Sequence, residues 1–121
     1  MSSTEIEIKR AYEPPAREDG ARVLVDRVWP RGVKKADLDI VLWARDAAPS
    51  NELRKWFGHD PKRWDGFRQR YFTELRHDPE ALKPIRELLR QGTVTLIYGA
   101  SDERHNQAVA LREFLGRETE A

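Results

Sequence analysis

The chain has 121 residues, a length that predicts one domain, residues 1–121, with a core large enough to fold alone. Its 22 Lys and Arg against 21 Asp and Glu give a net charge of +1, so it has no global attraction to nucleic acid or anionic membranes. The absence of cysteine excludes a disulfide scaffold, a thiolate nucleophile and a Cys-based zinc site. No apolar run approaches the roughly 20 residues of a membrane span or forms a signal peptide. We therefore expect a soluble cytoplasmic protein.

The first expected strand covers residues 5–10, where Ile6 and Ile8 alternate with charged residues. This alternation predicts a strand with one face in solvent, near the edge of a sheet. Residues 11–20 then form a loop, because two prolines and a glycine oppose regular structure. Loops of this length are often functional, although a merely solvated excursion is the alternative.

A second expected strand runs from about Arg22 to Val28 and begins with a short apolar run typical of a buried strand. The sequence then turns polar and reaches a proline and a glycine in residues 29–32, which end the strand. Side chains in this position lie at the carboxyl end of the strand, where open α/β sheets bind their ligands. This stretch is the first expected part of a ligand site.

The middle of the chain gives weaker signals at first. Residues 33–39 predict a turn or a short helix, and residues 39–45 are too short a run to decide between a strand and another buried segment. A helix is then expected over residues 51–57, with Ser50 as its N-cap because a serine hydroxyl can accept a hydrogen bond from a free backbone amide.

Aspartate-proline pairs predict the starts of two further helices. The first covers residues 62–76, where large apolar side chains recur at intervals of three and four. The second follows residues 78–79 and ends at Gly92.

The β-branched run over residues 93–98 predicts the clearest strand, and a turn leads from it into a last helix over about residues 103–115. Residues 1–4 and 117–121 are expected to be frayed. Strands separated by helices predict an α/β domain, with a mainly parallel sheet of three or four strands and helices on both faces. If the strands near residues 22 and 93 are parallel neighbours, their carboxyl ends share one rim.

Three segments of the chain resemble the YeaO-like family, a bacterial domain of unknown function (number 488). They read LVDRVWPRG, APSNELRKWFGHDPKRWDGFRQRYFTEL and TVTLIYGASDERHNQAVALREFL, and the resemblance covers residues 8–115. It implies a small α/β domain and no particular reaction. The matching residues are Asp26, Arg27, Trp29, Pro30, Arg31 and Gly32 in the first motif, Ala48, Pro49, Ser50, Leu53, Arg54 and His59 in the second, and Leu96, Tyr98, His105 and Asn106 in the third.

Four candidate site residues lie at the carboxyl end of the second expected strand or just after it. Asp26 and Arg27 are adjacent, so on a strand their side chains point to opposite faces. Asp26 is a candidate proton-transfer group, or else a buried carboxylate with hydrogen-bonded or charged partners. Arg31 lies on a stiff turn that could direct its guanidinium at a phosphate or carboxylate, unless it only serves the surface or a cap. Trp29 could stack on a ligand, although packing is the commoner role for a tryptophan beside a proline.

The second motif adds Ser50, Arg54 and His59 as candidate ligand contacts. Arg54 is expected in the first turn of the helix capped by Ser50, where a cation opposes the helix dipole and so hints at a bound anion or at an acidic partner elsewhere. His59 could act as a general base oriented by Asp60, but Asp60 is a standard helix cap.

The third motif places His105 and Asn106 in the expected first turn of the last helix, where free amides and the dipole favour an anion. His105 is the second candidate catalytic residue, and simple capping is the alternative. Tyr98, at the end of its strand, could add a hydroxyl donor.

No glycine-rich dinucleotide motif, P-loop or histidine pair with metal-ligand spacing is present, so the sequence predicts no metal site and leaves the cofactor unknown. Two functions remain. One is a crevice for a small phosphate or carboxylate, in a domain that handles a small molecule or nucleotide and whose status as an enzyme the sequence leaves open. The other is a non-catalytic module for nucleic acid or protein, which the near-neutral charge disfavours. Its residues would be Arg31, Lys34, Lys35, Arg54, Lys55, Lys62 and Arg63, with Trp29, Trp56 and Trp64.

Overall fold

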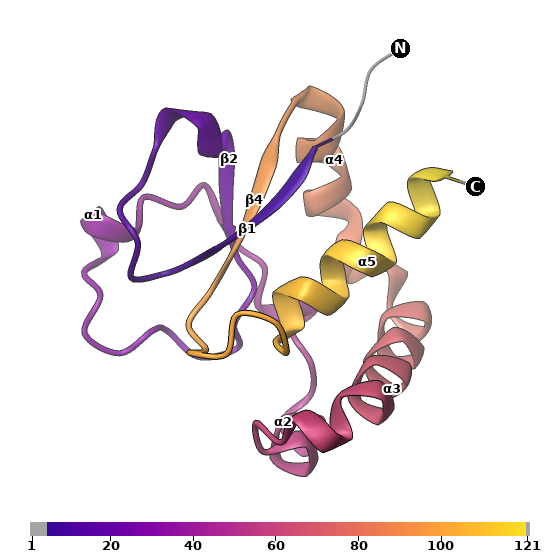
Figure 1. Cartoon of the computed structure of the whole chain (residues 1–121). Helices are drawn as coiled ribbons and strands as arrows, with labels where there is room; N and C mark the ends of the chain where they lie inside the picture. The colour runs from indigo at the N-terminus through magenta and orange to yellow at the C-terminus, as the bar shows by residue number, and fades with distance from the viewer. Residues whose placement is uncertain (1–4, 121) are drawn as a thin grey trace.

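A sheet of four parallel strands organises the chain, which the computed structural model describes over residues 5–120 (Figure 1). The strands are β1 (Ile6–Arg10), β2 (Ala21–Leu24), β3 (Leu42–Trp43) and β4 (Val94–Tyr98), and their order across the sheet is β1-β4-β2-β3. The predicted parallel neighbours β2 and β4 are confirmed, with Ala21 opposite Val94 and Leu24 opposite Ile97.

Position in the sheet accounts for the composition of the strands. β4 is paired on both sides and is buried along its whole length, as its β-branched and apolar residues require. β1 is an edge strand, so Glu7 can point into solvent while Ile6 and Ile8 pack against the core. The edge position predicted from this alternation is confirmed.

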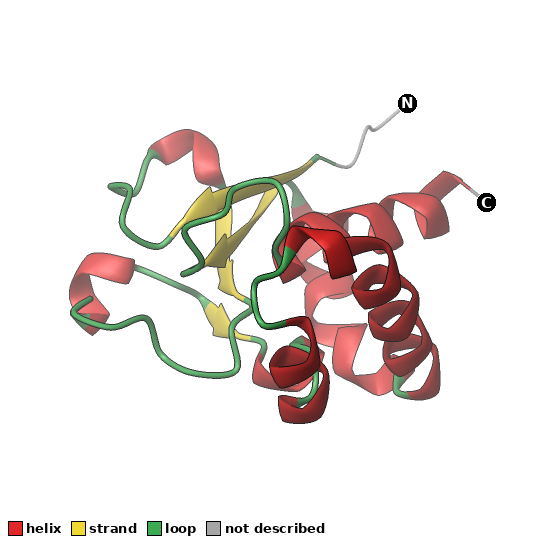
Figure 2. Ribbon diagram, turned by 60° about the horizontal axis from the view of Figure 1, so that its bottom comes forward, coloured by secondary structure: helices red, strands yellow, loops and turns green. Residues whose placement is uncertain are grey.

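The two faces of the sheet are covered unequally. Helices α2 (Asn51–Phe57), α3 (Trp64–His77), α4 (Lys83–Gln91) and α5 (Gln107–Glu120) gather on one side (Figure 2). There Phe67, Tyr71 and Leu111 pack with Leu96 in the larger core cluster. The other face is covered by the four-residue α1 (Lys35–Leu38) and by loops, with Leu38 packed on Leu24 and Ile97. The α/β class with helices on both faces is confirmed, and no helix within residues 5–120 is long and apolar enough to cross a membrane.

Several boundaries differ from the predicted ones. β2 ends at Leu24 instead of near Val28, which leaves Asp26 and its neighbours in a loop. The loop over residues 11–20 contains a 3₁₀ helix, Arg17–Asp19, despite its prolines. Residues 39–45, undecided from the sequence, contain the two-residue β3.

The predicted last helix was placed too early, because α5 begins at Gln107 and continues to Glu120. Of the ends expected to be frayed, residues 1–4 and residue 121 lie outside the described residues. Two expected caps are in place: the Ser50 hydroxyl accepts from the Leu53 N–H at 3.1 Å, and Asp60 accepts from the Lys62 N–H at 3.0 Å. Asp78, in the second aspartate-proline pair, makes no side-chain cap hydrogen bond.

A buried ion pair joins β1, the 3₁₀ helix and β2. The Arg22 side chain is 3% exposed and donates from Nη1 to the Asp19 carboxylate at 2.6 Å, while its Nε donates to the Leu38 carbonyl at 2.9 Å. Lys9 approaches the same carboxylate at 3.2 Å. Burial raises the pKa of Asp19, but hydrogen bonds from the Ala16 N–H, Lys9 and Arg22 outweigh it and hold the pKa below its usual value.

We expect Asp19→Asn to lower the free energy of unfolding at neutral pH by roughly 2 kcal/mol, because hydrogen bonds to a charged group contribute about 1.5–3 kcal/mol. A carboxyl with a depressed folded-state pKa stabilises the fold above its unfolded value of about 3.9, and this stability is lost as the pH falls through the folded value. The variant should therefore lose less stability on acidification than the wild type, as measured by urea unfolding at several pH values. Asp37→Asn, at an exposed position on α1, is the control. Equal acid sensitivity of wild type and Asp19→Asn would contradict this role.

Candidate functional site

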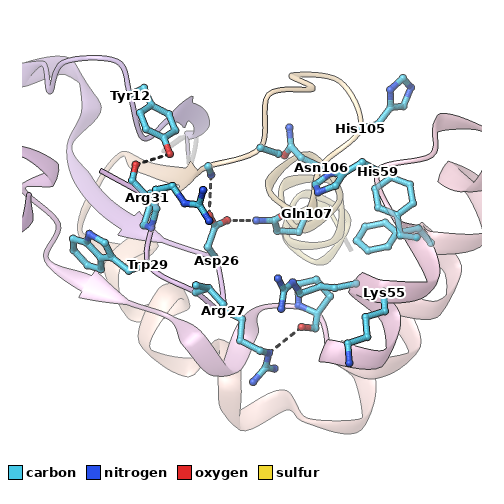
Figure 3. A pocket seen from close by; sticks show the side chains of 18 residues that line it. Tyr12, Asp26, Arg27, Trp29, Arg31, Lys55, His59, His105, Asn106 and Gln107 are labelled. Carbon is cyan, nitrogen blue, oxygen red and sulfur yellow. Dashed lines mark hydrogen bonds between the residues drawn. The ribbon is translucent and has the colours of Figure 1, made fainter. Parts of the chain in front are cut away.

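A crevice of about 540 Å³ opens at the carboxyl ends of β2 and β4 (Figure 3). Residues 26–31 after β2 line it, and residues 99–100 and 105–107 of the β4–α5 connection line it as well. The remaining walls come from Tyr12, from the region of α2 and from Phe67 of α3. The two segments expected at a common rim are thus brought together, with Arg31 and His105 bordering one cavity.

The lining of the crevice is strongly basic, although the whole chain is nearly neutral. It includes four cationic side chains and two histidines. Asp26 is the one carboxylate among the described residues that line it. The cationic and histidine side chains are Arg27, Arg31, Arg54, Lys55, His59 and His105.

Asp26 joins the two strand ends at the centre of the crevice. Its Oδ2 accepts from the Gly99 N–H at 2.9 Å, and its Oδ1 accepts from the side-chain amide of Gln107 (Figure 3). Burial raises the pKa of Asp26 to about 6, while the Gly99 N–H, the charge of Arg54 and the Gln107 amide work in the opposite direction. Asp26 is therefore a partly buried carboxylate with two specific donors.

Arg27 and Asp26 contact different elements, but both lie past the end of β2, so the alternation of strand side chains from which opposite directions were expected does not apply to them. Its Nε donates to the Pro49 carbonyl at 3.1 Å and its Nη2 donates to the Ala48 carbonyl at 3.3 Å. These bonds fasten the segment before α2 to the end of β2. Arg27 lines the crevice, but part of its guanidinium is committed to the backbone.

Arg31 and Trp29 have different roles. Arg31 is exposed, and its guanidinium makes no hydrogen bond or ion pair with any described residue of the chain, so its donors are available to a ligand. Trp29 donates from Nε1 to the Val33 carbonyl at 2.7 Å and packs edge-on against Trp43, with ring centroids 5.3 Å apart. The packing alternative for Trp29 accounts for these contacts.

In the second motif, Ser50 is a structural residue. Besides capping α2, its hydroxyl donates to the Glu74 carboxylate of α3 at 2.6 Å, and its backbone N–H donates to the same carboxylate. Ser50 is not among the residues that line the crevice, so the structure does not bring this candidate to the site.

The dipole argument for Arg54 is wrong. α2 has seven residues and places Arg54 and Lys55 in its last turn, where cations complement the helix dipole instead of opposing it. Arg54 lines the crevice and donates to the Asn51 side chain at 2.8 Å. His59 is exposed and lines the crevice from a left-handed backbone conformation, with φ of +58°, while Asp60 caps the next turn.

His105 and Asn106 precede α5, so the prediction that both lie in its first turn is wrong. Asp102 accepts from the backbone N–H groups of Arg104 and His105, at 2.9 and 3.0 Å, and holds this segment in a turn. Asn106 caps α5, accepting from the Val109 N–H at 3.1 Å. The amides at the start of α5 are therefore satisfied at least in part by the chain itself.

His105 keeps a polar partner that the sequence did not suggest. Its Nδ1 lies 2.9 Å from Asp102 Oδ2, and its ring packs edge-on against Trp64 at 5.3 Å. Hydrogen bonds from the Arg104 N–H and from His105 hold the pKa of Asp102 below its usual value. The carboxylate thus orients the imidazole, an arrangement that suits a proton acceptor.

Tyr98 lies beneath the site instead of in it. It is 2% exposed, and it is absent from the lining of the crevice. Burial is the main cause that raises its pKa. The expected hydroxyl donor at this position is therefore not presented to the cavity.

Sequence reasoning missed Tyr12, Asp102 and Gln107. Tyr12 belongs to the long loop that was suspected of function, and Asp102 stands three residues before His105, a spacing that turns commonly use. Gln107 had no signal, because its partner Asp26 is 81 residues away. No group of three or more His, Asp or Glu side chains that could hold a metal ion occurs among residues 5–117, whose side chains the structure describes.

Comparison with known proteins identifies relatives of the whole domain. A family model described as "Inactive DUF488-N3 subclade" matches residues 5–121. The uncharacterized protein Rv3073c of Mycobacterium tuberculosis (strain ATCC 25618 / H37Rv) is 41% identical over 115 residues, covering 95% of this chain and 97% of the relative. The uncharacterized protein YeaO of Escherichia coli (strain K12) is 38% identical over 110 residues, covering 91% of this chain and 96% of that protein. No solved structure matches the chain.

We expect Gly99→Ala to destabilise the protein by about 1–3 kcal/mol, the usual cost of forcing extra volume into a packed site. A Cβ at this position would lie 2.8 Å from Asp26 Oδ2, so the carboxylate must move away from the Gly99 N–H. Gly116→Ala is the matched control, because its Cβ meets nothing within 4 Å and alanine favours a helix by up to about 1 kcal/mol. Urea unfolding measures both, and a Gly99→Ala variant as stable as the wild type would show that the close approach imposes no constraint.

Proposed function

The chain belongs to the YeaO-like DUF488 family, and on that premise we propose that its crevice binds a small anion that carries a phosphate or carboxylate group. The observation that carries the proposal is the charge of the lining, with four cationic side chains around one carboxylate in a chain of net charge +1. Low-dielectric walls lined by one sign of charge concentrate ions of the opposite sign.

Binding from two sides is supported by the placement of the cations. Arg31 belongs to the wall that follows β2, and Lys55 belongs to the opposite wall formed by α2, with Asp26 and Gln107 between them (Figure 3). The Arg31 guanidinium has no partner among the described residues, and its planar fork matches a phosphate or carboxylate. Arg54 lies beside Lys55 on α2 and contributes further positive charge.

Binding without turnover is the form of the proposal that the relatives favour, since the matching subclade is described as inactive. If the crevice also supports a reaction, Asp26 and His105 are the residues to transfer a proton. Asp26 has a pKa raised to about 6, and Asp102 orients the His105 ring.

The alternative of a nucleic-acid module has less support from the aromatic side chains. The guanidinium carbons of Arg70 and Arg63 lie 3.9 and 5.3 Å from the centroid of the Trp56 ring. Trp64 stacks on Phe67, with centroids 5.6 Å apart. Rings engaged in this way are poor platforms for stacking bases.

We expect inorganic phosphate to bind the wild type, and Arg31→Ala to weaken that binding about tenfold or more, because a charge-assisted hydrogen bond contributes about 1.5–3 kcal/mol. Isothermal titration calorimetry at constant ionic strength measures the dissociation constants. Arg90→Ala removes an exposed arginine of α4 that pairs with Glu87 and does not line the crevice, and this variant should bind phosphate as the wild type does. Unchanged affinity in Arg31→Ala would show that Arg31 does not hold the phosphate and would contradict this assignment.

We expect affinity for sulfate to rise as the pH is lowered from about 7.5 to about 5.5, because Asp26 becomes neutral below its pKa of about 6 and no longer repels the anion. His59 and His105 also line the crevice, and any charge they gain would act in the same direction. Asp26→Asn isolates the carboxylate, since the Gln107 amide can turn its oxygen toward the new side chain.

This variant should bind sulfate more tightly than the wild type at about pH 7.5 and should show a smaller change in affinity on acidification. Sulfate is the probe because its own charge is constant over this range. Identical dissociation constants for the two proteins at the higher pH would contradict a role for Asp26 in the charge of the crevice.

A further inference from the structure

We infer that the ligand of the crevice is a phosphate monoester that carries a flat ring, with the phosphate at Arg31 and the ring against Tyr12 and Val28. The inference rests on the proposed anion binding and narrows its chemical class. It comes from the apolar part of the lining, which a bare anion would leave in contact with water.

Exposed apolar side chains are concentrated at this crevice. Among the described residues, the large hydrophobic side chains that are exposed are Tyr12, Val28 and Val41, at 48%, 59% and 64%. Tyr12 and Val28 line the crevice, whereas Val41 does not. Exposed apolar surface beside a group of cations is the composition expected of a site for an amphipathic ligand.

A hydrogen bond holds Tyr12 next to Arg31. Its hydroxyl donates to the Arg31 carbonyl at 3.0 Å, which fixes the ring beside the residue that offers its donors to an anion (Figure 3). The Arg10 guanidinium lies 5.0 Å from the centroid of the Tyr12 ring, yet nearly half of the tyrosine remains exposed. A ring joined to a phosphate on Arg31 would therefore find an aromatic neighbour within reach.

The size of the crevice also favours an organic ligand. Its volume of about 540 Å³ lies within the roughly 300–1,000 Å³ of typical small-molecule sites, and inorganic phosphate would fill a small part of it. A phosphate monoester suits the charge better than a carboxylate, because its second negative charge is favoured by the several cations of the lining.

Phenyl phosphate and methyl phosphate provide the test, since they share the charged group and differ in the ring. We expect phenyl phosphate to bind the wild type about tenfold more tightly, as measured by calorimetry at constant ionic strength and pH, because stacking on an aromatic side chain is of that order. Tyr12→Ala should reduce this preference to within about twofold, mainly through weaker binding of phenyl phosphate.

Three further variants, one of them a control, test where the ring of the ligand lies. Tyr12→Phe removes the hydrogen bond to Arg31 but keeps the ring, so it should retain most of the preference. Val28→Ser should reduce the preference, whereas Val41→Ser, a change of the same kind outside the crevice, should leave it unchanged.

The outcomes distinguish the two levels of the proposal. If both esters bind equally and Arg31→Ala weakens both, the crevice binds anions but has no ring site, and the inference is overturned while the proposed function stands. If neither ester binds and phosphate does not bind either, the proposed function fails too. A preference for phenyl phosphate that survives in Tyr12→Ala also overturns the inference, because the ring then lies elsewhere.

Discussion

The parallel pairing of β2 with β4 is the constraint on which the site depends. The register places Leu24 opposite Ile97, and the Val25 N–H donates to the Ile97 carbonyl at 3.0 Å, so the ladder continues just past the end of β2. The next residue, Asp26, then meets the Gly99 N–H across the same gap. The Asp26 carboxylate thus replaces a backbone acceptor where the pairing of β2 and β4 ends. The loops that leave the two strands diverge on either side of it and form the crevice.

This arrangement explains why the charge of the whole chain says little about the site. Acidic residues balance the basic ones in number. Many of the acidic residues form ion pairs away from the crevice, as Glu113 does with Arg68 and Arg117. Around the crevice, Asp26 is instead committed to Gly99 and Gln107, and Arg31 remains without an acidic partner in the described chain. Local positive charge is therefore left where the strands end.

The sequence predicted those features that depend on local pattern and on sheet topology. Apolar runs located β2 and β4, and the rule for parallel neighbours brought Arg31 and His105 to one rim. Predictions failed where the conformation depends on a hydrogen-bond partner that is distant in sequence, or on a competing helix cap. α5 begins at Gln107 because Asn106 caps it by accepting from the Val109 N–H, whereas Asp102 holds the preceding residues in a separate turn. The bond between Asp26 and Gln107 joins residues too far apart in sequence for any periodicity to show.

The aromatic residues divide into rings that pack within the fold and one ring, Tyr12, that remains largely exposed. All four tryptophans have ring partners: Trp29 packs on Trp43, Trp64 stacks on Phe67, and Arg70 lies over Trp56. Folding therefore uses the rings that composition alone would assign to a binding surface. Tyr12 also has a cation over its ring, Arg10 at 5.0 Å, but it is 48% exposed, and its hydroxyl donates to the carbonyl of Arg31, whose guanidinium has no partner in the described chain. An aromatic ring that is held in place yet left exposed beside an unpaired cation is better explained by a ligand than by the stability of the fold.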